Sequence, residues 1–179
     1  MRPMALENPG RLSSVALLTV AVAASAGPSS AELAAAKKFN PLIDALNQAS
    51  PAVFRDRAGY LRWANPETGP TCEEKNLSRP YPAQYAEPIS KSVAAAAKAA
   101  PKMKELDAAA NQYATSLARL GKLFAEASTY YGEHKYKGDG CGRGKAMHKE
   151  LMEAWDTFGA ADKAIRAAIQ QAEDERDAA

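Results

Sequence analysis

An uninterrupted apolar repeat in the second half of the chain constrains its fold more than any other feature. Between residues 103 and 131, apolar or small side chains recur in alternating steps of three and four, at Met103, Leu106, Ala110, Tyr113, Leu117, Leu120, Phe124, Ala127 and Tyr131. A later segment repeats the pattern at Met147, Leu151, Ala154, Phe158, Ala161, Ile165, Ala168 and Ala172. This spacing places all members of a repeat on one face of an α-helix. The sequence therefore predicts two long helices that each bury one stripe, the second from about residue 144 to residue 172.

The position at which the first of these helices begins depends on the effect of Pro101. Traced backwards, the apolar phase continues through Ala100, Ala96, Val93 and Ile89, although a proline inside a helix removes a backbone hydrogen bond. Because the phase is preserved, we expect one long helix that is kinked at Pro101. The alternative is two helices that fold back on each other at this proline.

The apolar pattern is less regular in the segment between residues 36 and 61. The first stripe consists of Ala36, Phe39, Ile43 and Leu46. Continuing its phase would bring Ser50 and Arg57 into the core. Serine is a good N-cap and proline is favoured at the first helical position, so Ser50-Pro51 predicts the start of a new helical stretch. The stripe of that stretch consists of Phe54, Ala58 and Leu61.

Two breaks separate the predicted helices. Residues 65–87 are rich in proline and show no periodicity, which predicts one long loop, and residues 133–143 hold closely spaced glycines, which predicts a hairpin. Residues 173–179 are polar on every side and predict a frayed acidic tail. Helices with apolar stripes bury them against one another at shallow crossing angles. We therefore expect one all-α domain over residues 27–179, an elongated bundle of three to four long helices with a tyrosine- and glycine-rich hairpin and one long proline-rich loop.

The N-terminal segment predicts export. After Arg2 and Arg11, an apolar run extends from residue 12 to Ala26 and closes on small residues that suit a signal peptidase. The run is shorter than the ~20 apolar residues that a membrane-spanning helix needs. We therefore expect a signal peptide over residues 1–26 that is cleaved after Ala26, and a mature protein that is periplasmic or secreted, with no stable membrane insertion.

The charge of the mature chain excludes one class of partner. Cleavage after residue 26 removes two of the 23 basic residues and one of the 21 acidic residues, which leaves a net charge of +1 over 153 residues. So small a net charge provides no strong field to attract a polyanion. We therefore expect no binding to nucleic acid.

The chain has two cysteines, Cys72 in the predicted long loop and Cys141 in the predicted hairpin. In an oxidising compartment an isolated pair is usually joined, so we expect a disulfide. A simple up-down-up bundle would place these two loops at opposite ends. The bond therefore requires the first helices to run parallel to the middle helix, with residues 73–87 travelling back along the bundle.

Several segments resemble a known family. Residues 101–107 (Pro-Lys-Met-Lys-Glu-Leu-Asp), Tyr113, residues 130–139 (Tyr-Tyr-Gly-Glu-His-Lys-Tyr-Lys-Gly-Asp), residues 144–148 and the earlier residues 39–47 are similar to the YiiG-like family, catalogued as domain of unknown function 3829. The resemblance implies an all-helical bacterial cell-envelope protein, often lipid-anchored, with no established activity. This chain departs from the pattern because it lacks an anchor cysteine, and its Gly138 and Cys141 make the hairpin unusual.

The predicted hairpin and its edges hold most of the chemically versatile side chains. The candidate binding residues are Tyr130, Tyr131, His134, Tyr136, Asp139 and His148. Zinc and copper sites need histidine, cysteine or carboxylate at short spacings, whereas His134 and His148 are fourteen residues apart and a disulfide removes Cys141 as a ligand. Met103 or Met147 with His148 would ligate a haem iron, but methionine on a seam usually serves packing. The alternative interpretation is tyrosines that pack the end of the bundle and exposed histidines.

No catalytic residues are predicted. Ser128 and Thr129 lie near the hairpin in sequence, but the spacing does not predict a general base within hydrogen-bonding distance of either hydroxyl. Trp63 and Trp155 are expected at core or bundle-edge positions. Two hypotheses follow: a non-catalytic envelope module that binds an unknown envelope protein or small ligand, or a metal- or haem-binding bundle that uses residues 130–148. We expect the first, without a cofactor or a metal.

Overall fold

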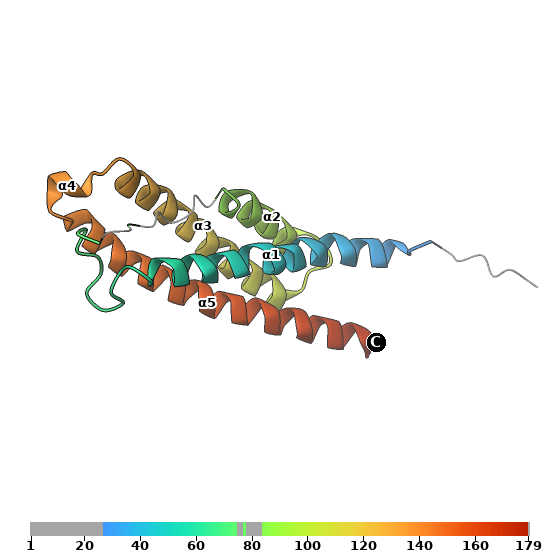
Figure 1. Cartoon of the computed structure of the whole chain (residues 1–179). Helices are drawn as coiled ribbons and strands as arrows, with labels where there is room; N and C mark the ends of the chain where they lie inside the picture. The colour runs from blue at the N-terminus through green and yellow to red at the C-terminus, as the bar shows by residue number, and fades with distance from the viewer. Residues whose placement is uncertain (1–26, 75–76, 78–83, 179) are drawn as a thin grey trace, which may run out of the picture.

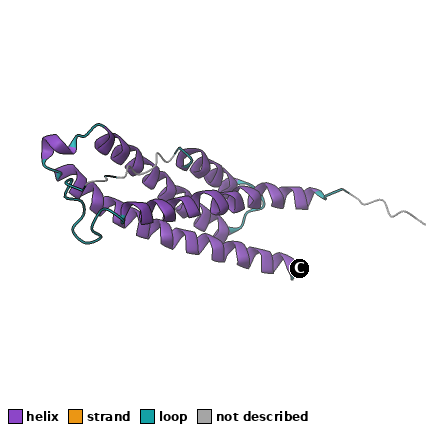
Figure 2. Ribbon diagram, viewed as in Figure 1, coloured by secondary structure: helices purple, strands orange, loops and turns teal. Residues whose placement is uncertain are grey.

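The computed structural model describes residues 27–74, 77 and 84–178, so the predicted signal peptide lies outside the described residues. The helices are α1 (Ser30–Tyr60), α2 (Ala86–Lys98), α3 (Lys104–Gly132), α4 (Tyr136–Asp139) and α5 (Gly142–Asp177). Within the described ranges there is no strand, only an isolated bridge between Asn65 and Gly69 (Figure 2). The prediction of an all-α fold is confirmed. None of the described helices has the length and apolar character required to cross a membrane.

The long helices lie side by side in an elongated bundle (Figure 1). α1 and α3 run in one direction along it, and α2 and α5 run in the other. The loop after α1 and the connection from α3 to α5 therefore meet at one end, here called the hairpin end and formed by residues 61–74 and 130–148. The parallel course of α1 and α3 is the arrangement that the predicted disulfide requires. The expected return of the chain over residues 73–87 falls largely outside the described residues.

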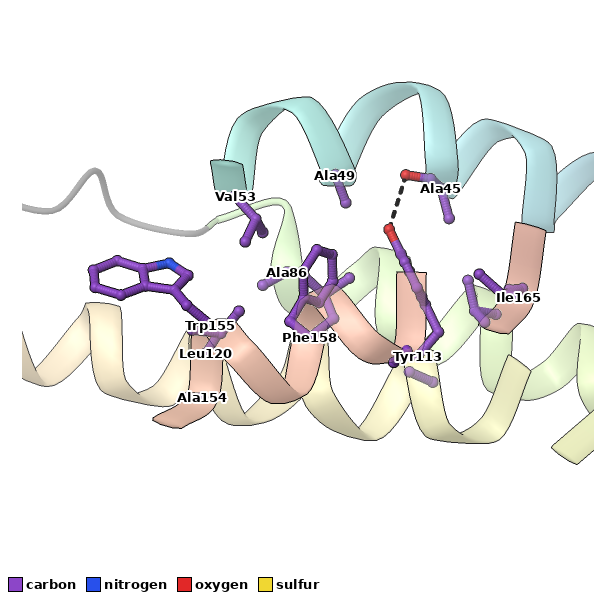
Figure 3. Packing of buried hydrophobic residues seen from close by; sticks show 14 of the residues in the cluster. Ala45, Ala49, Val53, Ala86, Tyr113, Leu120, Ala154, Trp155, Phe158 and Ile165 are labelled. Atoms are coloured by element: carbon purple, nitrogen blue, oxygen red, sulfur yellow. Dashed lines mark hydrogen bonds between the residues drawn. The ribbon is translucent and has the colours of Figure 1, made fainter. Parts of the chain in front are cut away.

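Both predicted seams pack into the core. In α3 every member of the repeat from Leu106 to Tyr131 is buried, and in α5 every member is buried except the half-buried Ala168. Aromatic side chains fill the space between the helices: the rings of Tyr113 and Phe158 have centroids 5.1 Å apart (Figure 3). The spacing of apolar residues alone thus identifies the packed faces of these two helices.

The predicted kinked helix at Pro101 is wrong, and the fold-back alternative is correct. α2 ends at Lys98 and α3 begins at Lys104, and the chain reverses direction between them. The apolar phase survives this reversal because both helices turn an apolar stripe toward the same core, with Val93 and Leu106 both buried. A preserved phase therefore did not require a continuous helix.

A buried lysine of α1 holds this turn between α2 and α3. The Lys38 ammonium donates hydrogen bonds to the carbonyl oxygens of Ala99 at 2.9 Å and Ala96 at 3.4 Å. It also pairs with Asp107 in the first turn of α3, with 2.5 Å between nitrogen and oxygen. A cation is favourable at the C-terminus of one helix, and a carboxylate at the N-terminus of the next. Lys38 therefore ties three helices together at this end of the bundle.

The predicted break at Ser50-Pro51 is also wrong. α1 is continuous over 31 residues, with Pro41 and Pro51 inside it. Its N-cap is Ser29, whose hydroxyl accepts a hydrogen bond from the backbone of Glu32 at 3.2 Å in a capping box. Ser50 is not a cap: it is buried and donates a hydrogen bond to Asp162 of α5 at 2.6 Å.

The core-facing stripe of α1 differs from the predicted one. Ile43 is 38% exposed and Phe54 is 42% exposed, and Ala58 also faces solvent. The buried residues of α1 are Lys38, Phe39, Leu42, Ala45, Leu46, Ala49, Ser50, Ala52, Val53 and Tyr60. The sequence interpretation rotated the stripe because it kept the polar side chains out of the core, whereas Lys38 and Ser50 are buried with partners.

The end of the chain is more helical than expected. α5 begins at Gly142 and continues to Asp177, where the sequence predicted a frayed tail from residue 173. The predicted hairpin contains the single turn of α4, followed by Gly140 and Cys141 with positive φ values of 58° and 66°. These two left-handed residues turn the chain sharply into α5.

Candidate functional site

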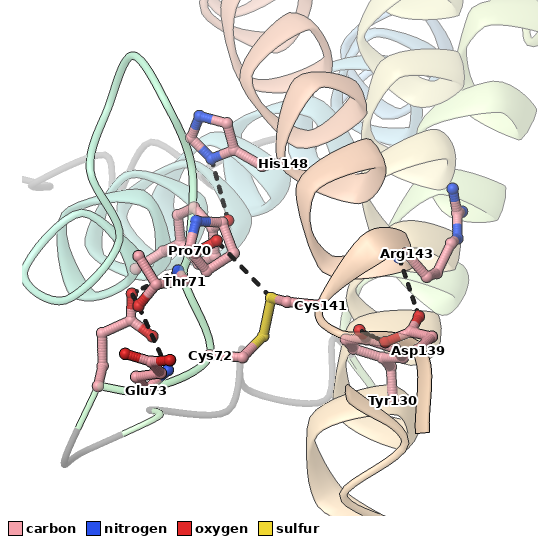
Figure 4. The surroundings of a disulfide bond; sticks show 11 residues. Pro70, Thr71, Cys72, Glu73, Tyr130, Asp139, Cys141, Arg143 and His148 are labelled. Atoms are coloured by element: carbon pink, nitrogen blue, oxygen red, sulfur yellow. Dashed lines mark hydrogen bonds between the residues drawn. A yellow bond between two sulfur atoms is a disulfide. The ribbon is translucent and has the colours of Figure 1, made fainter. Parts of the chain in front are cut away.

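A disulfide joins the two loops of the hairpin end (Figure 4). Cys72 follows α1, and Cys141 immediately precedes α5, with their Cα atoms 5.7 Å apart. The predicted pairing is therefore confirmed. The bond closes a segment of 69 residues, so it restricts the unfolded chain strongly.

Two glycines permit the close approach of the loops at this disulfide. Gly69 has φ of +79°, and a side chain there would come within 3.0 Å of the His148 ring. A Cβ atom at Gly144 would lie 2.9 Å from the sulfur of Cys141 and 3.1 Å from the hydroxyl of Tyr131. The contact with sulfur at Gly144 is shorter than real Cβ contacts, and at Gly69 a tight contact adds to the strain of a left-handed backbone, so both positions favour glycine.

His148 has both of its ring nitrogens engaged. The side chain is buried, and Nε2 lies 3.1 Å from the carbonyl oxygen of Pro66. Because a carbonyl only accepts, Nε2 carries the proton and donates it. Nδ1 lies 3.0 Å from the Tyr60 hydroxyl and accepts from it. Burial raises the pKa of Tyr60, which keeps this hydroxyl a donor.

Aromatic side chains surround this histidine and form the core of the hairpin end. The Tyr60 ring lies 4.9 Å from Trp63 and 5.4 Å from Trp155, measured between centroids. Trp63 in turn contacts Tyr131 edge-on at 5.4 Å. The indole N–H groups of Trp63 and Trp155 have no acceptor among the described residues. This part of the core therefore leaves hydrogen-bond donors unmatched, which is costly unless water or another acceptor reaches them.

Asp139 connects the hairpin to the start of α5. Its carboxylate accepts hydrogen bonds from the Tyr130 hydroxyl at 2.8 Å and from the backbone N–H of Arg143 at 3.0 Å. The Arg143 backbone donor lowers the pKa of Asp139. Burial and the bond to Asp139 raise the pKa of Tyr130 to about 12. The Arg143 guanidinium also donates to Glu126 of α3 and Glu150 of α5, both at 2.6 Å.

The structure divides the predicted site residues into two groups. Tyr131 and His148 lie buried against Tyr60 and Trp63, whereas His134, Tyr136 and Asp139 belong to the exposed turn of residues 133–140, here called the outer hairpin. His134 is exposed, with φ of 58°, and its ring centroid lies 5.8 Å from that of the half-buried Tyr136. Tyr130 bridges the two groups. The candidate residues therefore fall in two places, the buried core of the hairpin end and an exposed turn.

The proposed metal ligands do not converge. Within the described residues, no group of three His, Cys, Asp or Glu side chains is placed to hold a metal ion. His148 has no free nitrogen lone pair, and Cys141 is bonded to Cys72. Met103 precedes α3 at the opposite end of the bundle from His148, so these two cannot share a haem iron.

A buried polar cluster that the sequence analysis missed lies in the middle of the bundle. Ser50 donates to Asp162 at 2.6 Å, and the Tyr113 hydroxyl lies 2.9 Å from the Ser50 oxygen and 3.2 Å from the Ala45 carbonyl. Arg166 donates to the other oxygen of Asp162 at 2.9 Å. The available signal was the position of Asp162, between two seam residues of α5. A serine that donates to a carboxylate, with both histidines at the hairpin end, is not an activated nucleophile.

Comparisons with known proteins match the chain to proteins without an assigned activity. The family model described as "Protein of unknown function (DUF3829)" matches residues 34–179. "Uncharacterized protein YiiG" of Escherichia coli (strain K12) is 29% identical over 144 residues, which cover 78% of this chain and 41% of that protein. The chain thus spans about two fifths of the length of this relative. No solved structure matches the chain.

Proposed function

The chain belongs to the DUF3829 family, and from that premise we propose that it is an exported, non-catalytic binding module of the cell envelope. Its interaction surface is the outer hairpin, defined as residues 133–140. The partner is an envelope protein or a small ligand that contacts this turn.

The observation that carries the proposal is that the outer hairpin is exposed but held from three sides. The disulfide holds the end of the turn at Cys141. Asp139 fixes it through Tyr130 and the backbone of Arg143, and the ring of Tyr136 lies against Tyr130 and Tyr131 at 6.4 Å. His134, Lys135 and Lys137 remain exposed on it. A pre-organised turn loses little conformational entropy when a partner binds, which favours recognition.

Catalysis and metal binding have weaker support than recognition. The groups with chemical potential at the hairpin end already serve as structural partners: His148 bonds Tyr60 and Pro66, and Asp139 bonds Tyr130 and Arg143. A general base needs a free lone pair within reach of a substrate proton. The alternative of a metal- or haem-binding bundle is left with His134 as its exposed histidine, and no group of three His, Cys, Asp or Glu among the described residues is placed to hold a metal ion.

Export is supported by two independent features. Residues 1–26 have the composition of a cleavable signal peptide. The disulfide belongs to an oxidising compartment, because cytosolic thiols are kept reduced. N-terminal sequencing of protein recovered from the periplasm tests this part: we expect Gly27 as the first residue, and a retained leader would contradict the proposal.

The interaction surface is tested by site-specific photo-crosslinking in cells. A photoreactive amino acid at His134 should give a covalent adduct of discrete mass. The matched control is Lys163, which is also exposed but lies on α5, 21 residues beyond Gly142 and therefore about 30 Å along the helix. We expect no adduct from that position.

A second control separates a specific surface from general reactivity. Replacing Cys72 with Ser and Cys141 with Ala releases the outer hairpin, so the adduct at His134 should become weaker while the protein stays helical. Absence of any adduct at His134, or equal adducts at His134 and Lys163, would remove the outer hairpin as the interaction surface.

A further inference from the structure

The most exposed large apolar side chains of the described residues all lie on α1. They are Leu33 at 57%, Ile43 at 38% and Phe54 at 42% exposure. Their separations of ten and eleven residues correspond to rotations that keep the three on one side of a helix. α1 is therefore apolar on two sides, one that faces the core and one that has no covering element in the described structure.

This outer stripe borders a groove between α1 and α5. Two adjoining clefts of about 690 Å³ and 320 Å³ lie along the seam of these helices and share Ile43 and Glu173 in their walls. Further along the seam, the Phe54 ring lies 5.9 Å from Phe158 of α5. The remaining apolar lining residues are Ala31, Ala35, Ala36, Phe39, Leu46, Ile169 and Ala172 of the two helices, with Pro101 and Met103 of the turn between α2 and α3. The stripe and the groove thus form one continuous apolar surface, here called the α1/α5 face.

The arrangement of the helices explains why the N-terminal end of this face is uncovered. The N-terminal turns of α1 and the C-terminal turns of α5 extend beyond the turn that joins α2 to α3 (Figure 1). Over this stretch α1 and α5 have only the turn between α2 and α3 beside them, and Pro101 and Met103 of that turn line the wall of the larger cleft. A further helix that packs into an apolar groove at this place would bury apolar surface that is now exposed to solvent.

We propose that the α1/α5 face docks a second copy of this chain, with the two α1 helices antiparallel about a two-fold axis near Ile43. Ile43 lies ten residues from Leu33 and eleven from Phe54. The stripe is therefore almost symmetric about its centre. An antiparallel partner sets Leu33 of one copy level with Phe54 of the other, and the two Ile43 side chains close to the axis. A two-fold interface requires this kind of self-complementarity.

The charges at the ends of the face are complementary in the same arrangement. The C-terminal part of α1 carries the exposed basic residue Arg55, Arg62 follows in the loop after α1, and the last turns of α5 carry the acidic residues 173–175. Since α5 runs antiparallel to α1, its acidic end lies beside the N-terminus of α1. The antiparallel partner brings its basic end to this place, and sets Arg55 of one copy level with Glu32 of the other. Opposite charges at both ends favour this orientation over the parallel one.

The size of the face indicates a weak, reversible dimer. α1 has 31 residues and is therefore about 46 Å long, and a strip one helix wide covers roughly 500 Å² on each chain. Stable complexes bury about 800 Å² on each partner. The dimer is therefore expected to dissociate in the micromolar concentration range.

The first test uses engineered thiols in the full mature chain. The described residues contain no free cysteine, so a new thiol reacts without interference from the native pair. Ile43→Cys lies near the two-fold axis and should form a covalent dimer under mild oxidation. Lys122→Cys, exposed on α3 away from the α1/α5 face, is the control and should stay monomeric. A mixture of Leu33→Cys and Phe54→Cys chains should form a mixed dimer in preference to either chain alone.

The second test measures association without a crosslink. Sedimentation of the wild-type chain should show a concentration-dependent dimer, and Leu33→Glu with Phe54→Glu should weaken it by at least about tenfold. Both side chains are exposed, so the circular dichroism of this variant should match the wild type. A wild-type chain that is monomeric up to ~100 μM, a dimer that persists in the Glu variant, or no crosslinking of Ile43→Cys above the control would each overturn the proposal.

Discussion

Removal of the disulfide between Cys72 and Cys141 should lower the melting temperature of the protein while leaving its helices in place. The variant best suited to this test is Cys72→Ser with Cys141→Ala. Cys141 is 1% exposed, so alanine avoids burying an unpaired hydroxyl there, whereas Cys72 is only half-buried and tolerates serine. The seams of α3 and α5 do not depend on the bond, so the far-UV circular dichroism should remain strongly helical.

The magnitude follows from the length of the closed segment. The two cysteines are 69 residues apart, and the chain-entropy relation for a loop of that length gives about 4 kcal/mol of stabilisation at 25 °C. A domain of about 150 residues loses about 2–4 °C of melting temperature per kcal/mol. We therefore expect the variant to melt roughly 8–16 °C below the wild type.

The assay is thermal melting of the oxidised wild type, the reduced wild type and the variant. Reduced wild type and variant should melt at similar temperatures, and reductant should have no effect on the variant, which is its own control. Denaturing alkylation should find no free thiol before reduction and two afterwards. An unchanged melting temperature on reduction, or two free thiols in exported protein before reduction, would refute this reasoning.

Three further changes test the packing. Gly69→Ala should destabilise the fold by about 1–2 kcal/mol in chemical denaturation, because alanine must adopt a left-handed backbone there and its Cβ contacts His148. Gly138→Ala is the control and should be close to neutral, since a Cβ atom at that position meets no neighbour. Lys38→Ala should lower the free energy of unfolding by about 3–5 kcal/mol in the same assay, because Asp107 and two carbonyls lose their partner. An unfolding midpoint equal to that of the wild type would contradict the role of Lys38. Phe158→Asp should abolish cooperative melting, since it places an unpaired charge in the core; wild-type-like melting would mean that the seam of α5 is not packed.

The parts of the fold that were predictable are those where burial follows a local period. The seams of α3 and α5 repeat over eight or nine positions, and every one of these positions holds an apolar or small residue. The disulfide was predictable for a different reason, since two cysteines allow one pairing. Pro101 shows the limit of the method, because a stripe on each of two antiparallel helices has the same phase as a stripe on one helix.

The candidate site was predictable in composition but not in geometry. The sequence indicated that tyrosine, histidine and aspartate cluster near the hairpin, and the Tyr130–Asp139 bond joins two of the predicted residues. The partners of His148 come from Tyr60 and the Pro66 carbonyl, more than 80 residues earlier in the chain. No local pattern relates positions that far apart, so the sequence could not separate a ligand histidine from one that is fully bonded.

The failure of pattern reading in α1 has the same cause as its uncovered face. The helix carries apolar residues on two sides, and the side that faces the core also carries Lys38 and Ser50, which a local reading assigns to solvent. A buried lysine costs several kcal/mol unless it is paired, and its partner Asp107 lies on another helix. Once Lys38 turns inward, Leu33, five residues earlier and about 140° around the helix, must turn outward, while Ile43 and Phe54 lie at the edge of the buried side. α1 therefore holds more apolar side chains than one core uses, and the surplus is the surface available to a second copy.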